Sequence, residues 1–430
     1  MRSRWFLAPA AVVVASAAGA ACADSEPAND GAPPSETEQP EAGATGDSGS
    51  AEPDATTTEP DADAVRTRCS SAGWCVTPLP DADLVMTDIW PVGARAFAIA
   101  ESPTIGVKVL EWDPGTAAWG YIDDGTQNAP GLGLYAGGIW APSDGEVFFG
   151  VGPGYVFHGT RPIPPATSWT WTRAKLPDGN LAAGVRETAA DGQVSQSETE
   201  LKRPSLGIWG TSRDDVYAWY TNSLFHLESE SWVQVYAITD KGSPAERVKF
   251  LSGSGSGPDD IWFSGVRSTS TLSQCALVVR KSAGNYVRIA DANVSAGCQP
   301  KEGYLYIGRL PLTNIHPIAA DTAVALLGIG EVVKIARDGT GYTKSSSRVP
   351  AAVANQRDFF SLWTSDGDVW LSGRSQIVHG TAIWDGGSYA ISTIASDELP
   401  LGRPLIQIRG TSTTNLWAIG ERYAIHKTTP

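Results

Sequence analysis

Histidines are the first residues in this 430-residue sequence that could do chemistry, because histidine is a common general base and metal ligand. Four of the five occupy one recurring context, in which two apolar residues precede the imidazole, at His158, His226, His379 and His426. One position of a repeated unit occurs once in each repeat, so these four do not converge on a metal ion. We therefore predict a structural hydrogen-bonding role for them. His316 falls in a different context and has no second candidate ligand.

Carboxylates recur at a second repeated position, just before an apolar run. The members are Asp144, Asp214, Asp215, Asp259, Asp260 and Asp368, with Asn415 in the last copy. Asp and Asn side chains accept backbone N–H bonds in turns. This interpretation is favoured over a calcium site or an acid–base site.

Other motifs add no catalytic constellation. There is no G-x-S-x-G elbow, and the alternating glycines of 253–257 lack the lysine and helix of a phosphate loop. The segments 338–342 and 385–389 resemble the Asp-box turns of sialidase-type propellers, which are structural, and they lack the leading serine. Trp171, Trp384 and Tyr135 could stack on sugar rings. We predict no catalytic residue, metal ligand or cofactor, and the ligand-binding residues stay unassigned.

The elements that carry these residues form a repeat. Each unit has an inner strand rich in Ile and Trp, a polar turn, two further apolar strands, and an aromatic residue that opens a fourth strand. The inner strands fall in the segments 88–100, 137–152, 206–220, 247–265, 313–328, 360–373 and 406–420. Seven four-stranded units with a period of roughly 40 to 70 residues predict a seven-bladed β-propeller. A count of six or eight stays open, because the fourth and fifth units are degenerate and 304–308 is a predicted strand that belongs to no unit.

The last repeat stops one strand short. The segment 74–79 (WCVTPL) has the pattern of a fourth strand and precedes the first repeat. We expect it to pair with 423–427 and close the ring. The repeat resembles the Trp/Gly-rich "IWG-S-DVWAVG" repeats of predicted exported β-propeller lipoproteins of Gram-negative bacteria, over roughly 74–430. That resemblance implies a fold and no established activity.

The N-terminus has the pattern of an export signal. Arg2 and Arg4 precede an apolar run that is too short to span a membrane, and small residues lead to Cys22. This predicts a signal peptide over 1–21 and lipidation at Cys22 in a lipobox that has Gly19 where Leu is usual; cleavage to a soluble secreted chain is the alternative. Residues 23–68 are low in complexity, with twelve acidic residues before position 66, and predict a disordered tether to a propeller at 69–430.

Five cysteines support this arrangement, since a lipidated Cys22 leaves an even number. We predict disulfides Cys69–Cys75 and Cys275–Cys298. Long segments at 123–136, 177–204, 266–274, 291–303 and 395–404 fall in links that share one face of the propeller, here called the top face. Cys275–Cys298 would hold 291–303 there.

These features predict a non-catalytic, monomeric propeller, anchored by lipid in the bacterial cell envelope or secreted, that binds a protein or a glycan through its top-face loops. A propeller glycosidase or lyase and an envelope scaffold are the alternatives. The net charge of −15 argues against a nucleic-acid partner.

Overall fold

The structure is a computed structural model, and it describes residues 69–130, 132, 135–177, 206–243, 246–270, 273–328, 330–355, 358–396 and 399–429. The predicted signal peptide, Cys22 and the tether lie outside these residues. No helix within the described ranges is long and apolar enough to span a membrane.

Seven four-stranded antiparallel sheets make up the fold, each with its strands in sequence order except the last. Blade 1 contains β2 (Val85–Val92), β3 (Arg95–Ser102), β4 (Gly106–Asp113) and β5 (Ala118–Tyr121). Blade 2 contains β6 (Tyr135–Ser143), β7 (Glu146–Gly152), β8 (Tyr155–Thr160) and β9 (Thr170–Lys175). Blade 3 contains β10 (Leu206–Ser212), β11 (Asp215–Tyr220), β12 (Ser223–Glu228) and β13 (Ser231–Ala237). Blade 4 contains β14 (Arg247–Gly257), β15 (Asp260–Ser270), β16 (Ser273–Ser282) and β17 (Asn285–Ala290).

The remaining blades follow the same order. Blade 5 contains β20 (Leu312–Ala319), β21 (Thr322–Leu327), β22 (Glu331–Asp338) and β23 (Gly341–Arg348). Blade 6 contains β24 (Phe359–Ser365), β25 (Asp368–Gly373), β26 (Gln376–Thr381) and β27 (Ser388–Thr393). Blade 7 contains β30 (Leu405–Ser412), β31 (Asn415–Gly420), β32 (Ala424–Lys427) and β1 (Trp74–Thr77). The predicted seven-bladed all-β propeller is confirmed.

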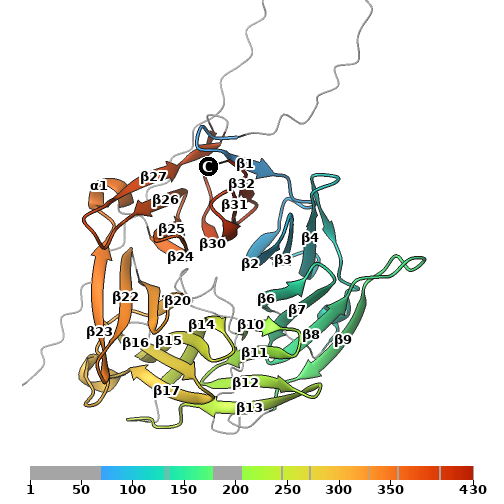
Figure 1. Cartoon of the computed structure of the whole chain (residues 1–430). Coiled ribbons are helices and arrows are strands. Elements are labelled where there is room, and N and C mark those ends of the chain that lie inside the picture. Colours follow the sequence, from blue (N-terminus) through green and yellow to red (C-terminus); the bar gives the residue numbers. More distant parts are fainter. Residues whose placement is uncertain are drawn as a thin grey trace, which may run out of the picture. The chain divides into compact units, whose positions relative to one another are not determined.

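The first strands of successive blades contact one another and form the inner ring, with fourth strands at the periphery (Figure 1). Each first strand begins at the top face and ends at the opposite, bottom face. The links between blades and the turns between second and third strands therefore lie at the top. The turns between first and second strands, and between third and fourth strands, lie at the bottom.

Ring closure occurs as predicted. β1 pairs with β32 in an antiparallel register that sets Trp74 opposite Lys427 and Thr77 opposite Ala424. β1 ends at Thr77, so 78–79 leave the sheet. The Trp74 side chain is fully buried, meets Trp370 of blade 6 edge-on, and donates a 2.9 Å hydrogen bond from Nε1 to Ser392 Oγ. The start of the described chain thus fills the outermost position of the last blade.

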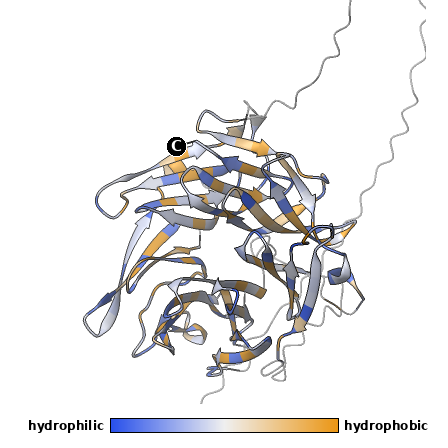
Figure 2. Cartoon of the chain, turned by 45° about the vertical axis from the view of Figure 1, so that its right-hand side comes forward, coloured by the Kyte–Doolittle hydropathy of each residue, from blue (hydrophilic) through white to orange (hydrophobic). Residues whose placement is uncertain are grey.

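The core lies between blades, because both faces of every sheet are covered by a neighbouring sheet. Apolar residues therefore occur in unbroken runs on second strands, such as Val216–Tyr220, which are buried throughout. Figure 2 shows apolar residues concentrated along the inner strands and polar residues toward turns. Small residues allow close approach: a Cβ at Gly207 would lie 2.0 Å from the Trp219 ring.

Several top-face links are more ordered than the sequence suggested. Segment 266–274 was expected to be irregular, but it mostly continues β15 and β16, since blade 4 extends a regular hairpin beyond its neighbours. Two-stranded hairpins occupy the links that follow blades 4 and 6: β18 (Ala292–Asn293) with β19 (Gln299–Pro300), and β28 (Ala395–Ser396) with β29 (Leu399–Pro400). Segment 304–308 forms no strand and makes one isolated bridge, from Leu305 to Ala290. Most of segment 177–204 lies outside the described residues.

Candidate functional site: polar pairs, an inner seam and the top face

The recurring histidines meet the recurring Asp and Asn side chains within single blades. The Nε2 atoms of His226, His379 and His426 lie 3.0, 2.8 and 2.8 Å from side-chain oxygens of Asp215, Asp368 and Asn415 respectively. Each pair joins the first residue of a second strand to the third strand beside it. In the sequence the two sets stand at separate repeat positions, yet all three pairs share a separation of eleven residues. That constant spacing was the signal that would have joined them.

Each histidine also stacks on the aromatic ring opposite it in the second strand. The ring centroids of His379 and Trp370 are 4.0 Å apart, and those of His426 and Trp417 are 3.8 Å apart. His158 stacks on Phe148, but its Nε2 lies 3.9 Å from Glu146 Oε1, beyond hydrogen-bond distance. Burial lowers the pKa of His426 to about 4, so its imidazole is neutral at pH 7. These histidines therefore stabilise the blades.

Two blades use different residues at the same place. In blade 4, Arg280 stands where the histidine would be, stacks on Trp262 with 5.0 Å to the ring centroid, and donates from Nε to Asp260 at 2.8 Å. In blade 1 the charges are inverted, with Arg95 donating to Glu111 at 2.6 Å. The position therefore requires a complementary polar pair near the bottom turn, and its chemistry varies from blade to blade.

Inner strands make hydrogen bonds from one blade to the next. Ser254 Oγ donates to Ile315 O at 2.6 Å, and Ile408 N donates to Ser361 Oγ at 3.2 Å. At the junction of blades 1 and 2, Ile139 N donates to Asp88 Oδ2 at 2.9 Å. These bonds join the inner strands of blades 4 and 5, 6 and 7, and 1 and 2, and we call them the polar seam.

Asp88 is the one carboxylate on the seven described inner strands. It accepts from Ile89 N and from Gln407 Nε2, and pairs with Arg409 at 3.3 Å. Burial raises its pKa, although Arg409 opposes that change. A glycosidase of the usual kind needs two carboxyl groups a few ångströms apart, and Asp88 stands alone among these strands, held by donors from blades 1, 2 and 7.

His316 lies on β20, an inner strand, as predicted. Its pKa is lowered to about 4, chiefly by burial and further by the charge of Arg409. The described residues contain no group of three or more His, Cys, Asp or Glu side chains able to hold a metal ion.

The remaining sequence candidates have structural contacts. Trp171 is partly buried against the core between blades 1 and 2 and donates from Nε1 to Ile122 O, while Trp384 lies under the ammonium of Lys334. Tyr135 is 48 % exposed at the top face. Tyr342 and Tyr389, which end the two Asp-box-like segments, bridge outer strands of neighbouring blades by accepting from Arg280 and donating to Ser347.

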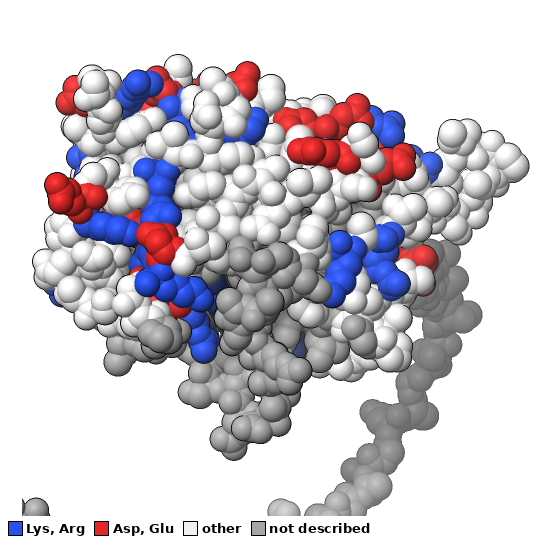
Figure 3. All heavy atoms as spheres, turned by 90° about the horizontal axis from the view of Figure 1, so that it is seen from below, with Lys and Arg blue, Asp and Glu red and all other residues white. Residues whose placement is uncertain are grey.

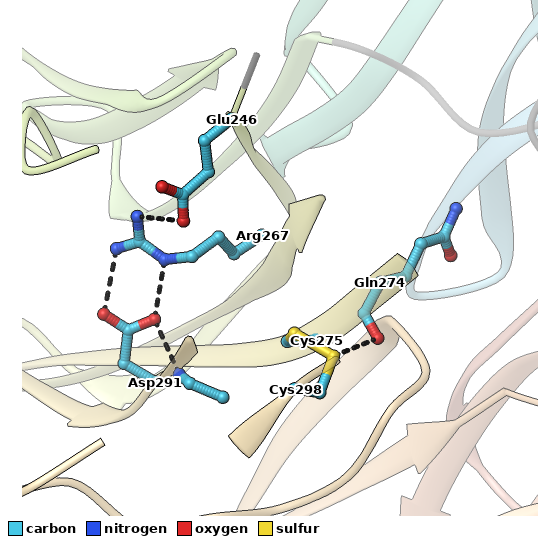
Figure 4. Close-up of a disulfide and its surroundings, with 7 residues drawn as sticks. Glu246, Arg267, Gln274, Cys275, Asp291 and Cys298 are labelled. Carbon is cyan, nitrogen blue, oxygen red and sulfur yellow. Dashed lines mark hydrogen bonds and ion pairs between the residues drawn. A yellow bond between two sulfur atoms is a disulfide. The ribbon is translucent and has the colours of Figure 1, made fainter. Parts of the chain in front are cut away.

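The top of blade 4 is the most heavily braced part of the top face. Both predicted cysteine pairs are brought together as disulfides, with Cα–Cα distances of 3.9 Å for Cys69–Cys75 and 5.6 Å for Cys275–Cys298. The second joins β16 to the hairpin of β18 and β19. Figure 4 shows it beside an ion-pair network centred on Arg267.

Arg267 is 2 % exposed and engages two carboxylates. Its Nε and Nη2 donate to the two carboxylate oxygens of Asp291 at 2.8 and 2.9 Å, and its Nη1 donates to Glu246 at 3.1 Å (Figure 4). Arg288 and Lys301 add further pairs to Asp240 and Asp291. Burial opposes the charge of Asp291, but the bonds from Arg267 outweigh it and lower the pKa of this carboxyl. Three cations and three carboxylates thus connect the links that precede and follow blade 4.

Charge is unevenly distributed over the surface. In Figure 3, Lys and Arg gather in groups in the lower part of the view, and the broadest acidic group lies in the upper part. At the top of blade 1, the exposed side chains of Ile105 and Tyr121 lie among carboxylates that include Asp81 and Asp83, and Tyr135 is exposed at the start of blade 2. Between blades 2 and 3 the top face has a shallow apolar pocket lined by Leu176, Pro177, Tyr220 and Phe225.

Comparison with solved structures identifies β-propellers. A structure described as YCF48 bound to a D1 peptide superposes with a TM-score of 0.53 at 11 % identity, covering 83 % of this chain and 97 % of that one. The WD40 repeats of RRP9 give a TM-score of 0.51 at 11 % identity, covering 84 % and 99 %. No family model and no curated protein matches the chain. At these identities the likeness shows the fold alone: a seven-bladed β-propeller.

Proposed function

We propose that this protein is a non-catalytic binding protein whose propeller presents its top face to a protein partner. The observation that carries the proposal is that the side chains able to do acid–base chemistry are engaged in contacts within the fold. Three of the recurring histidines are paired with Asp or Asn inside their blades, and the inner-strand carboxylate Asp88 is held in the seam. What the described surface offers instead is a wide face with exposed apolar and charged side chains, of the kind that protein partners bind.

The structural neighbours support this choice over a glycan ligand. The propeller described as YCF48 is recorded with a peptide, and the RRP9 neighbour is a WD40 propeller. Glycan binding by stacking needs exposed aromatic rings. Of the three aromatic candidates, Trp171 and Trp384 are engaged in packing contacts, and Tyr135 is the one exposed at the top.

A photo-crosslinking experiment in cells tests the proposal. A photoreactive amino acid placed at Tyr135 or Ile394 lies on the top face, where these side chains are 48 % and 50 % exposed. The matched control positions, Ile163 and Ile318, lie on the bottom face at 82 % and 41 %. We expect a discrete protein adduct from the top positions and none from the bottom. Adducts of equal yield from both faces, or none from either, would refute top-face binding.

Export and lipid anchoring form a separate part of the proposal, supported by the charged start, apolar run and Cys22 of the sequence. We propose that Cys22 becomes the lipidated first residue of a chain held in the cell envelope by an acidic tether. Mass spectrometry of the mature N-terminus should find a diacylglyceryl Cys22. A free amino terminus at Ala21 or Asp24 would contradict lipidation and leave secretion. An envelope scaffold is the related alternative, and the crosslinking pattern separates it by showing adducts on both faces.

A further inference from the structure

The link after blade 4 contains a sequence motif that the proposed function does not use. Asn293, Val294 and Ser295 read N-V-S, which is the acceptor pattern for N-linked glycosylation because a residue other than proline separates the Asn from the Ser. Of all the asparagines in the sequence, Asn293 alone has Ser or Thr two positions after it. The chain therefore offers a single candidate of this kind, at the top of blade 4.

The local backbone turns the acceptor outward. Asn293 is the last residue of β18 and is exposed, whereas its neighbours Ala292 and Val294 are each 2 % exposed. Both neighbours pack against the disulfide of blade 4. Because successive side chains of an extended segment point to opposite sides, the amide of Asn293 faces solvent. Ser295 is exposed as well, so a sugar can be attached here without displacing a buried side chain.

No contact among the described residues gives Asn293 a structural role. It stands at the N-cap of the short 3₁₀ helix Val294–Ala296, a place where Asn commonly accepts a backbone hydrogen bond, but its side chain makes no such cap. Neither Asn293 nor Ser295 forms a side-chain hydrogen bond to another described residue. Both polar groups of the motif are thus available on the surface.

Anchors on both sides hold the hairpin that carries the motif. Asp291, two residues before the acceptor, is bound by Arg267 at 2.8 and 2.9 Å. Cys298, five residues after it, is joined to Cys275 of β16 (Figure 4). Between these anchors β18 pairs with β19. The acceptor amide therefore stands on a fixed support at the rim of the top face.

We propose that Asn293 is a glycosylation site, modified by a cellular transferase that uses a lipid-linked oligosaccharyl pyrophosphate. The inference rests on the export part of the proposed function, because it places the motif in a chain that crosses the membrane. In the reaction Nδ2 of Asn293 forms a bond to C1 of the first sugar. The bond between C1 and the pyrophosphate oxygen breaks, and the lipid pyrophosphate leaves with the electron pair. One amide proton passes to a base of the transferase, which recognises the Ser295 hydroxyl.

A glycan at this position would restrict where a protein partner binds. Attached glycans are bulky and well hydrated, so this one would cover the exposed residues of its own hairpin, which are Ala296, Gln299 and Pro300. The crosslinking positions Tyr135 and Ile394 lie in other links, at the start of blade 2 and after blade 6. A partner on the top face would therefore contact those blades rather than blade 4.

Mass spectrometry of the full chain, purified from the cells that produce it, tests the proposal. After reduction, trypsin cuts behind Arg288 and Lys301, so one peptide, residues 289–301, carries the whole motif. Fragmentation that leaves the sugar attached assigns it to one side chain. The same digest reads the mature N-terminus, which reports export independently.

Four variants separate the motif from its surroundings. Asn293→Gln and Ser295→Ala remove the motif, and Ser295→Thr keeps it. The matched control is Asn285→Gln, at an exposed asparagine of the same blade that has no Ser or Thr two positions on. Thermal unfolding of each variant verifies that the propeller is folded.

We expect a glycan on Asn293 at the wild-type level in Ser295→Thr and Asn285→Gln, and at least a tenfold loss in Asn293→Gln and Ser295→Ala. An unmodified peptide 289–301 from a chain with a processed N-terminus would overturn the glycosylation site and leave the export proposal intact. Sugar on Ser295, or an equal loss in Asn285→Gln, would overturn the site as well. A chain that keeps residues 1–21 would contradict export itself and this inference with it.

Discussion

Replacement of Trp74 by alanine tests how much of the propeller depends on ring closure. Trp74 is fully buried in β1, which is joined to blade 7 by hydrogen bonds and side-chain packing and to the next blade by the chain. Removing a buried Trp side chain costs about 3–5 kcal/mol. Loss of the Nε1 bond to Ser392 adds about 1 kcal/mol. At about 2 °C per kcal/mol for a chain of this size, we expect Tm to fall by about 8 °C or more.

A matched substitution separates closure from ordinary core loss. Trp232 opens the fourth strand of blade 3, the same repeat position, and is 8 % exposed. Trp232→Ala creates a comparable cavity, but its strand stays covalently tied to β12 by a short turn. We therefore expect both variants to lose stability, and only Trp74→Ala to release its partner strand.

Hydrogen exchange provides the decisive measurement. If β1 detaches, β32 becomes the edge of its sheet, and amides of Ala424–Lys427 that pair with β1 should exchange at least tenfold faster. In Trp232→Ala the amides of β12 should keep their protection. Unchanged exchange in β32, or an unchanged Tm, would refute the argument that β1 holds the ring closed.

Three further predictions concern polar groups and the second disulfide. Arg267→Met removes the cation that pairs with buried Glu246 and leaves Asp291 with Arg288 and Lys301, so urea unfolding should show a loss of about 3 kcal/mol, and acid should restore part of it by protonating Glu246. The pKa of His426 is lowered to about 4 from an ordinary value near 6.5, so the stability that its neutral imidazole contributes is present above pH 6.5 and is lost as pH falls toward 4. After discounting for partial exposure, we expect the free energy of unfolding to fall by about 2 kcal/mol over that window. The fall should be smaller in His426→Gln, which has no imidazole to protonate. Cys298→Ser removes the disulfide to Cys275, which joins residues 23 positions apart, and calorimetry should find the free energy of unfolding lowered by about 2–3 kcal/mol.

The fold was predictable because the repeat is long and its turn residues and aromatic residues recur at the same positions. Each unit begins with an inner strand, which in the last unit contains Ile408 and Arg409. Asp or Asn follows the first turn, and an aromatic residue opens the fourth strand. Repetition supplied what one unit would not, since each blade is a minor variant of the others. Ring closure was predictable too. The last unit lacks its fourth strand and an extra strand precedes the first unit, so the extra strand is expected to complete the last sheet.

Segment 266–274 shows where this reasoning failed. Its serines, threonines and glycine-free sequence fit a loop as well as an exposed hairpin, and the outcome depends on contacts with the link after blade 4. Arg267 lies in this segment, and its guanidinium is bound by Asp291, which follows β17, and by Glu246, which precedes β14. The sequence pattern of a repeat marks strands and turns but not ion pairs between the links at its two ends, so it does not reveal these contacts.

The His and Asp side chains illustrate why candidate chemistry needs geometry. A histidine beside a carboxylate is the start of a catalytic dyad, and the eleven-residue spacing brings the two groups to 2.8–3.0 Å in blades 3 and 6. A working dyad also needs a substrate pocket, whereas here the ring of His379 is stacked at 4.0 Å on Trp370. In blade 7 an Asn replaces the Asp, and in blade 4 an Arg replaces the His. The hydrogen bond between the second and third strands is kept, although neither pair could act as a His–Asp dyad. What recurs is a hydrogen bond that ties strand two to strand three, which is why function must be sought on the face where the blades differ.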